Sequence, residues 1–439
     1  MLIQRKAVVH FLLLTAFLFV ILPALSVAQS ETEELRLEDL ISELVKSNPE
    51  LLAAEIRYKA ASLKPAIERA FPDPRISFGW MSAGTLLPGG GIGEDPNANV
   101  SLQVAQMIPY PGKRDLRSSI AKKEAENAKW MQSSALKSRV AALKAAYYEL
   151  AAVHQVINLL KEHQDLLLQL QKVAEARYAV GKAMQQDLIR AGTEVAILEN
   201  RRLSLTQKEL SLAAEIDTLL NRAPTIPLGR PQLPEMPQLA PYEKLIAVIR
   251  QNSPVLKAQQ ATIDGRQLEI QLAKKEKLPD VDLMSGYYYM GELEDMWEVK
   301  AEISIPVFSK SKRRAQVERA GLELAEAHQN YRSTEQMLEF RLRDAYLKAE
   351  TAKNLVDLYS SRIIPQSRLA LESSLASYES GGVDFFTVLT NFATIVEYRI
   401  NLYEQQAEYL KALVALEELL GVEPIEIPSE SPEKKRVRS

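Results

Sequence analysis

The fold is decided by the stretch Trp297-Glu-Val-Lys-Ala-Glu-Ile-Ser-Ile305, in which apolar residues alternate with polar or small ones without a break. Successive side chains of a β-strand point to opposite faces, so this pattern predicts a strand with one apolar and one polar face. Three further segments alternate in the same way. We therefore predict four strands, over residues 75–83, 99–108, 280–290 and 296–306.

The four predicted strands raise the question of a membrane. Each has about ten residues, the length at which a tilted strand crosses a bilayer. Four strands cannot close a membrane barrel, since single-chain barrels begin at about eight, and open strand edges are not tolerated in hydrocarbon. If the strands span a membrane, several copies of the chain must therefore contribute to one barrel. A small soluble sheet with one face on a core is the alternative.

Aromatic residues cluster near the ends of the predicted strands, as they do in the interfacial belts of membrane proteins. Some adjoin the long helical segments, and the others lie toward the loops between strands. We predict that six of them mark the two membrane interfaces: Tyr110, Phe308, Trp80, Tyr287, Tyr289 and Trp297.

Two long segments follow the strand pairs and predict unusually long helices. Residues 114–176 contain no Pro or Gly, and residues 310–364 contain only Gly321. About 60 residues of continuous helix reach about 90 Å, far beyond a globular helix. Such helices are stable only when packed along their whole length, as in antiparallel coiled coils. The predicted fold is therefore mainly α, with a small β part.

The sequence predicts two successive segments with the same order of helices and strands. Residues 29–224 and 242–424 each contain an opening helix, two strands and a long helical hairpin, and the Pro-rich stretch 225–241 connects them. The hairpin tips are predicted near 178–187 and 378–388. This shared order of landmarks predicts an internal duplication. Two unrelated helical domains of similar composition are the alternative.

The two ends of the chain are predicted to lie outside these two segments. Residues 1–28 carry two cations, an apolar run and a small-residue exit, which predicts a secretory signal peptide, with an N-terminal membrane anchor as the alternative. Residues 425–439 are polar, charged and Pro-containing, which predicts a disordered tail.

Composition excludes several classes of function. The chain has no cysteine, so disulfides, thiolate metal sites and a lipidated N-terminal Cys are ruled out. Its formal net charge of −3 gives no basic bias toward nucleic acid. No catalytic motif, phosphate-binding loop or metal-ligand cluster stands out. We therefore predict a protein that is not an enzyme and has neither a cofactor nor a resident metal.

The chain resembles the TolC family of outer-membrane efflux proteins over essentially its whole length after the signal peptide. The specific motifs are Tyr178-Ala-Val-Gly181 followed by Asp187-Leu188, and Tyr378-Glu-Ser-Gly381 followed by Val388-Leu389. The closing Leu416-Glu-Glu-Leu-Leu-Gly421 resembles the usual end of that family's C-terminal helix.

This resemblance implies an architecture, a location and partners. It implies a homotrimer in the outer membrane of a Gram-negative bacterium, with a shared twelve-stranded barrel in the outer-membrane lipid and a helical tunnel in the periplasm. It also implies a periplasmic adaptor and an inner-membrane pump as partners. The chain would then be the exit duct of a tripartite efflux pump, conducting substrates passively.

The resemblance also places functional residues at the hairpin tips. Two glycines would form the tip turns, because glycine adopts a positive φ at little cost. Termination of the helix alone is the alternative role for both glycines. An acidic residue near the first tip matches a family position where a ring of carboxylates constricts the tunnel mouth. The second tip departs from this pattern by having Thr at the matching position, and helix N-capping is the alternative role for both acids. The tip residues are Tyr178, Gly181, Asp187, Tyr378, Gly381, Asp384 and Thr387.

The exported substrate does not follow from the sequence. The segment 106–114 resembles a form common in members that serve heavy-metal pumps, and methionines lie in or beside the strands, where packing is their commoner role. A duct of a type I protein-secretion system is the alternative within transport. A soluble periplasmic coiled-coil protein is the alternative from another class.

Overall fold

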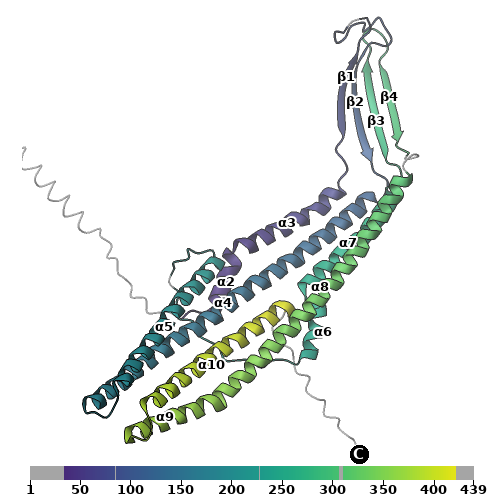
Figure 1. Cartoon of the computed structure of the whole chain (residues 1–439). Coiled ribbons are helices and arrows are strands. Elements are labelled where there is room, and N and C mark those ends of the chain that lie inside the picture. The colour runs from purple at the N-terminus through teal and green to yellow at the C-terminus, as the bar shows by residue number, and fades with distance from the viewer. Residues whose placement is uncertain (1–33, 85, 227, 306–309, 422–439) are drawn as a thin grey trace, which may run out of the picture.

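A computed structural model shows an elongated molecule with a β-sheet at one end and a long helical body at the other (Figure 1). The structure describes residues 34–84, 86–226, 228–305 and 310–421. The predicted signal peptide, the predicted C-terminal tail and Phe308 lie outside the described residues.

The two halves of the chain have the same order of elements. The first half contains α2 (Leu37–Ser47), α3 (Pro49–Arg69), β1 (Arg75–Met81), β2 (Asn99–Ile108), α4 (Lys113–Ala179) and α5 (Gln185–Leu219). The second half contains α6 (Tyr242–Asn252), α7 (Pro254–Lys275), β3 (Val281–Tyr289), β4 (Met296–Ile303), α8 (Lys310–Leu358), the π-helical turn η2 (Tyr359–Ile363), α9 (Ile364–Ser380) and α10 (Phe385–Leu420).

The opening helix of each half is divided in two, where the sequence predicted one helix. In the first half the break falls at Asn48, whose side chain accepts hydrogen bonds from the backbone N–H groups of Glu50 and Leu51. Pro49 occupies the first helical position, where its missing N–H costs nothing. Pro254 begins α7 in the same way. The Pro motifs therefore mark a new start rather than a point inside one helix.

The long helix of the second half runs further than the Pro-free segment that predicted it. It continues past Pro365 to Ser380, through the π-helical turn η2. Proline lacks the backbone N–H that an α-helix interior uses, and a π-turn re-arranges the local hydrogen bonds without ending the rod. α8, η2 and α9 therefore match the unbroken 67-residue α4.

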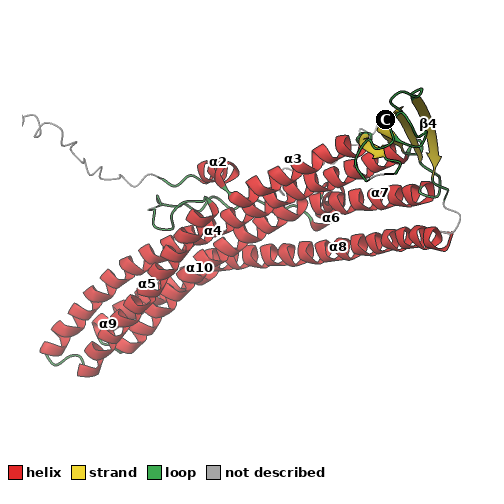
Figure 2. Cartoon of the chain, turned by 90° about the horizontal axis from the view of Figure 1, so that it is seen from above, coloured by secondary structure: helices red, strands yellow, loops and turns green. Residues whose placement is uncertain are grey.

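Shorter helices stack end to end along the long ones (Figures 1 and 2). The C-terminal end of α5 meets the N-terminal end of α3, because Ser47 Oγ donates to the carbonyl of Leu220 (2.8 Å) and Asn48 Nδ2 donates to the carbonyl of Leu219 (2.8 Å). In the other half, α10 ends at Gly421 beside Asn252 at the end of α6. None of the helices in the described part of the chain has the apolar stretch that a bilayer span requires.

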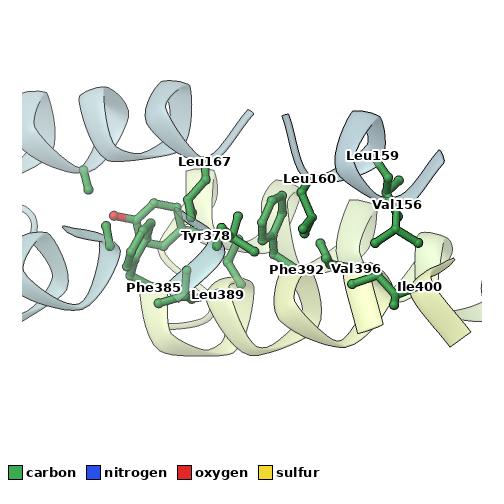
Figure 3. Close-up of a cluster of buried hydrophobic side chains, with 14 residues drawn as sticks. Val156, Leu159, Leu160, Leu167, Tyr378, Phe385, Leu389, Phe392, Val396 and Ile400 are labelled. Carbon is green, nitrogen blue, oxygen red and sulfur yellow. The ribbon is translucent and has the colours of Figure 1, made fainter. Parts of the chain in front are cut away.

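Three buried apolar clusters hold the helices together. One joins α2 and α3 to α4 and α5, a second joins α6 and α7 to α8 and α10, and the third joins α4, α5, α9 and α10 near their far ends (Figure 3). Fully buried alanines such as Ala151 and Ala349 allow the helix backbones to approach closely.

The four strands form one antiparallel sheet in the order β1-β2-β3-β4. β2 pairs with β3, so the sheet joins the two halves of the chain. The register places Ile76 opposite Val104, and Val104 opposite Ser285. Strands β1 and β4 are the edges, and within the described residues neither has a partner on its outer side.

Candidate functional site: two helical tips and a two-faced sheet

The two hairpin tips share one turn geometry. Gly181 and Gly381 both have a left-handed backbone, with φ of +73° and +84°. The N–H of Gly181 donates to the carbonyl of Tyr178 (2.9 Å), and the N–H of Gly381 donates to the carbonyl of Tyr378 (3.1 Å). Such positive-φ helix ends favour glycine because a Cβ atom is strained there. The same motif therefore ends both long rods and allows the chain to turn back.

Both tip acids cap a returning helix. Asp384 is the N-cap of α10, and its carboxylate accepts hydrogen bonds from the backbone N–H (2.9 Å) and the hydroxyl (2.6 Å) of Thr387. These bonds hold the pKa of Asp384 below its usual range. Asp187 lies in the first turn of α5, where its carboxylate accepts from the N–H of Met184 (3.2 Å) and is largely buried. The capping role thus has direct geometric support.

The two matched tyrosines have different environments. Tyr178 is half exposed, whereas Tyr378 is buried and packs against Phe385 with ring centroids 5.5 Å apart. Burial raises the pKa of the Tyr378 hydroxyl, which has no hydrogen-bond partner among the described residues. The two tyrosines therefore occupy matching positions in the sequence but differ in burial and in contacts.

Arg177 joins the two tips, and sequence reasoning missed it. Its guanidinium donates to the carbonyl of Tyr378 (2.7 Å) and lies 4.5 Å from the centre of the Tyr378 ring. The second half has Ser377 at the matching position, so no repeated pattern singled out this arginine. The contact ties the end of α4 to the end of α9.

A buried histidine lies in the core behind the tips. His163 packs against Phe392, with ring centroids 5.6 Å apart, and its Nδ1 lies 2.9 Å from the carbonyl oxygen of Leu159. Burial is the largest cause of a lowered pKa for His163, and the charge of Arg399 lowers it further. This core is the cluster that holds α4 against α10 (Figure 3).

The sheet has one apolar and one polar face. The apolar face is exposed, with Val299 84% and Trp297 76% accessible. The polar face carries charged pairs, such as Arg75 with Asp282 at 3.4 Å. From the register, the apolar face includes Ile76, Phe78, Trp80, Val100, Leu102, Val104, Ile108, Val281, Leu283, Tyr287, Tyr289, Trp297, Val299, Ala301 and Ile303, with Gln106 and Ser285 as its polar members.

The described aromatic residues that were predicted to mark the membrane interfaces lie at the two ends of the sheet. Trp80, Tyr287, Tyr289 and Trp297 lie on the apolar face near the inter-strand loops, where the rings of Tyr287 and Trp297 are 4.9 Å apart. Tyr110 follows β2 at the helical end and is half exposed. This is the distribution that an apolar band with two polar boundaries requires.

The strand methionines lie on the polar face, not on the apolar one. Met107 pairs with Asp282, Met284 with Lys300, and Met296 with Tyr288. No group of three or more His, Asp or Glu side chains in the described part of the chain is arranged to hold a metal ion.

A buried ion pair fixes the helical body to the sheet. Lys113, at the start of α4, is 1% exposed, and its Nζ lies 2.9 Å from Oδ1 of Asp280. It also donates to the carbonyl of Leu278 (2.8 Å), and the N–H of Tyr110 donates to Asp280 (2.7 Å). The pair connects the first half of the chain to the second at the point where helices become strands.

Family comparison agrees with this two-faced sheet on a helical body. Residues 40–222 and 245–422 match the family described as "Outer membrane efflux protein". The chain therefore belongs to this family of outer-membrane efflux and secretion ducts, with the helical part in the periplasm. Such a protein is a transport duct and not an enzyme, and the soluble coiled-coil alternative is set aside.

The similarity to individual relatives is low in sequence identity. The chain is 22% identical over 420 residues to the cobalt-zinc-cadmium resistance protein CzcC of Cupriavidus metallidurans, covering 91% of this chain and 96% of CzcC. It is 26% identical over 266 residues to protein CyaE of Bordetella pertussis, covering 58% of this chain and 55% of CyaE. The alignment thus spans about half the length of CyaE.

Solved structures with the same fold include CusC, whose structures concern transmembrane channel formation, and the outer membrane protein VceC. CusC matches with a TM-score of 0.74 at 15% identity, covering 88% of this chain and 92% of CusC. VceC of Vibrio cholerae matches with a TM-score of 0.74 at 18% identity, covering 88% of this chain and 96% of VceC. At these identities the likeness establishes the fold alone. The mainly helical fold with a small sheet is thereby confirmed.

Proposed function

We propose that three copies of this chain form the exit duct of a tripartite efflux pump. Substrates would pass from a periplasmic adaptor and an inner-membrane pump through the helical body and out through a shared barrel. The observation that carries the proposal is the sheet. It has an exposed apolar face, a charged opposite face and two edges that pair with no other strand among the described residues.

The unpaired edges argue for several copies. In hydrocarbon each unpaired backbone group costs several kcal/mol, so a spanning sheet must close on itself. The four strands β1 to β4 are too few to close alone. If β4 of one copy pairs with β1 of the next, three copies give a closed twelve-stranded barrel with the charged face inside.

The helical body supports the same arrangement. Exposed apolar side chains lie on α3 and on α8. These two helices flank α4 and α7 in the part of the helical body that adjoins the sheet. Leu63 and Ile67 on α3 and Leu322 and Phe340 on α8 are each more than 60% accessible. Contact between α3 of one copy and α8 of the next would bury both surfaces and continue the wall of a tunnel.

The two tips are the proposed tunnel entrance and adaptor-docking site. They lie at the end of the body opposite the sheet (Figure 1), which is the periplasmic end if the sheet lies in the membrane. Tyr178, Gly181 and Asp187 from one tip would meet Tyr378, Gly381, Asp384 and Thr387 from the other around the mouth. The shared tip turn and element order also support reading residues 29–224 and 242–424 as repeats.

A protein-secretion duct is the second candidate. The alignment with CzcC favours metal efflux, because it covers nearly all of both chains, as does the resemblance of segment 106–114 to heavy-metal members. A deletion strain separates them: metal or drug sensitivity with normal protein export supports efflux, and the reverse supports secretion.

The direct test of the duct is assembly and conductance. Protein extracted from outer membranes is cross-linked in detergent and then inserted into planar bilayers. The proposal predicts a covalent species of three chains and discrete conductance steps. A protein released without detergent as a monomer, with no conductance, would overturn it.

A further inference from the structure

Charge is distributed very unevenly along the axis of the molecule. The four segments that adjoin the helical ends of the strands, 69–73, 113–117, 274–280 and 310–314, together form what we call the basic collar. It contains eleven Lys and Arg and four Asp and Glu, a net charge of +7 in a chain whose overall net charge is −3. The four segments gather where the sheet meets the helical body (Figure 1).

The opposite end of the sheet has the reverse charge. The inter-strand segments 82–98 and 290–295 contain five Asp and Glu and no Lys or Arg. These two segments contact each other, since the backbone of Gly93 approaches that of Glu292. The sheet therefore separates a cationic end from an anionic end, and only the cationic end adjoins the helices.

The acids of the collar are mostly used within the fold. Asp280 pairs with the buried Lys113, Glu276 pairs with Arg117 (2.8 Å), and Asp115 lies 3.8 Å from Arg69. Five exposed cations have no ion-pair partner among the described residues. They are Lys274, Lys277, Lys310, Lys312 and Arg314.

Three of these cations occupy a position that is unfavourable for the helix itself. Lys310, Lys312 and Arg314 lie at the start of α8, whose first turn contains no acid. The N-terminal end of a helix carries a partial positive charge, so cations there reduce helix stability and an anion restores it. Lys274 and Lys277 lie at and just beyond the C-terminal end of α7, which packs beside α8. The cations at the start of α8, with two more beside them on α7, form a local positive potential that attracts anions.

An exposed aromatic ring lies beside a cation within the collar. Phe71, exposed just before β1, has the guanidinium of Arg114 at 3.4 Å from its ring centre. An apolar ring beside a cation suits the boundary between acyl chains and phosphate groups. The apolar face of the sheet begins immediately beyond, at Ile76 and Ile303.

We propose that the basic collar binds the phosphate groups of anionic phospholipids in the periplasmic leaflet of the outer membrane. Lys274, Lys277, Lys310, Lys312 and Arg314 make the contacts. This inference rests on the proposed membrane-spanning role of the sheet. Juxtamembrane cations gain affinity from an anionic leaflet, and this gain is screened by salt.

The test uses the full-length protein in a neutral detergent with added lipid of one class. Native mass spectrometry counts bound phosphatidylglycerol or phosphatidylethanolamine with the same acyl chains. We expect phosphatidylglycerol to bind about tenfold more tightly, with the preference falling as salt rises. Equal binding of the two lipids by the unaltered protein would overturn the proposal without any variant.

A charge-neutralised variant locates the site. The set Lys274→Gln, Lys277→Gln, Lys310→Gln, Lys312→Gln and Arg314→Gln is expected to remove the preference. The matched control neutralises five cations far from the sheet, Lys161→Gln, Lys172→Gln, Arg332→Gln, Arg341→Gln and Arg368→Gln, and is expected to keep it. A preference retained in the collar variant would contradict the assignment, as would competition by millimolar inorganic phosphate alone.

The outcome is separable from that of the proposed duct. Cross-linking and conductance are measured on the same collar variant. Loss of the lipid preference in a conducting trimer supports the collar as a lipid site. Failure of the unaltered protein to form a trimer or to conduct counts against the duct. If the unaltered protein forms a conducting trimer but shows no lipid preference, that result counts against the collar alone. Binding of an acidic periplasmic protein in place of lipid would also overturn the collar proposal.

Discussion

Nζ of Lys113 lies 2.9 Å from Oδ1 of Asp280 across the junction between α4 and β3, and the lysine is 1% exposed. The two residues are 167 positions apart in the chain. A buried charge that loses its partner is left uncompensated, so this pair controls how firmly the sheet is fixed to the helical body.

Removal of either partner is expected to destabilise the protein unequally. Asp280→Ala leaves the buried Lys113 without its nearest counter-charge and costs about 3 kcal/mol. Lys113→Met leaves a carboxylate that reaches solvent and costs about 1–2 kcal/mol. Thermal unfolding in detergent measures both. Arg69→Gln, which removes an exposed pair with Asp115 at 3.8 Å, is the control and is expected to have little effect. Equal, small shifts in all three would contradict this account.

The tip glycines are expected to resist substitution for a backbone reason alone. Gly181→Ala and Gly381→Ala meet no atom within 4 Å, yet both positions have positive φ, so each costs about 1 kcal/mol in local stability. Gly192→Ala, in the helical interior of α5 with equally open space, is the control and is expected to stabilise by about 0.5–1 kcal/mol. Hydrogen exchange of the tip amides measures the change in local stability. The same change in exchange rate in all three variants would contradict this explanation.

Asp384 is expected to make the start of α10 pH-sensitive. Because its pKa is lowered in the folded protein, its capping contribution is present above the ordinary carboxyl range and is lost as the pH falls through the folded pKa. The protection of the Thr387 amide, measured as its exchange rate relative to the intrinsic rate at the same pH, should therefore fall in acid. Asp384→Asn keeps a capping oxygen without a titrating group, so its exchange should not show this added acid dependence.

His163 is expected to weaken the core behind the tips in mild acid. Burial lowers its folded pKa below the unfolded value of 6.5, so its contribution is present above that value and is lost as the pH falls toward the folded pKa. His163→Gln should flatten the fall in melting temperature between about pH 7.5 and 5.5. The more exposed His154, which contacts Glu209 at 2.8 Å, provides the control variant His154→Gln. A pH profile that is unchanged in His163→Gln would contradict this assignment.

The strands and tips were predictable because their signals are local. The alternating pattern predicted all four strands to within a few residues. Gly181 and Gly381 marked the two turns because both positions have a positive φ, which favours glycine. Long Pro-free segments likewise predicted the long helices.

The rest depends on contacts between distant segments. Nothing near Lys113 indicates that Asp280 lies beside it, and Arg177 contacts Tyr378 without any counterpart in the other half. The unequal burial of Tyr178 and Tyr378 arises from packing, which identical motifs cannot show. The π-helical turn before Pro365 is a further feature that no local pattern indicated.

The central claim is that strand β4 of one copy pairs with strand β1 of the next, and cysteine cross-linking tests it most directly. The chain has no cysteine of its own, so Ser77→Cys on β1 can be combined in turn with Met296→Cys, Glu298→Cys, Lys300→Cys or Glu302→Cys on the same face of β4. Within one copy these edges are separated by about three strand spacings, roughly 14 Å, which no disulfide spans. The account predicts that one combination gives covalent species that end at three chains. Absence of cross-links in every combination, or a ladder that continues beyond three, would contradict it.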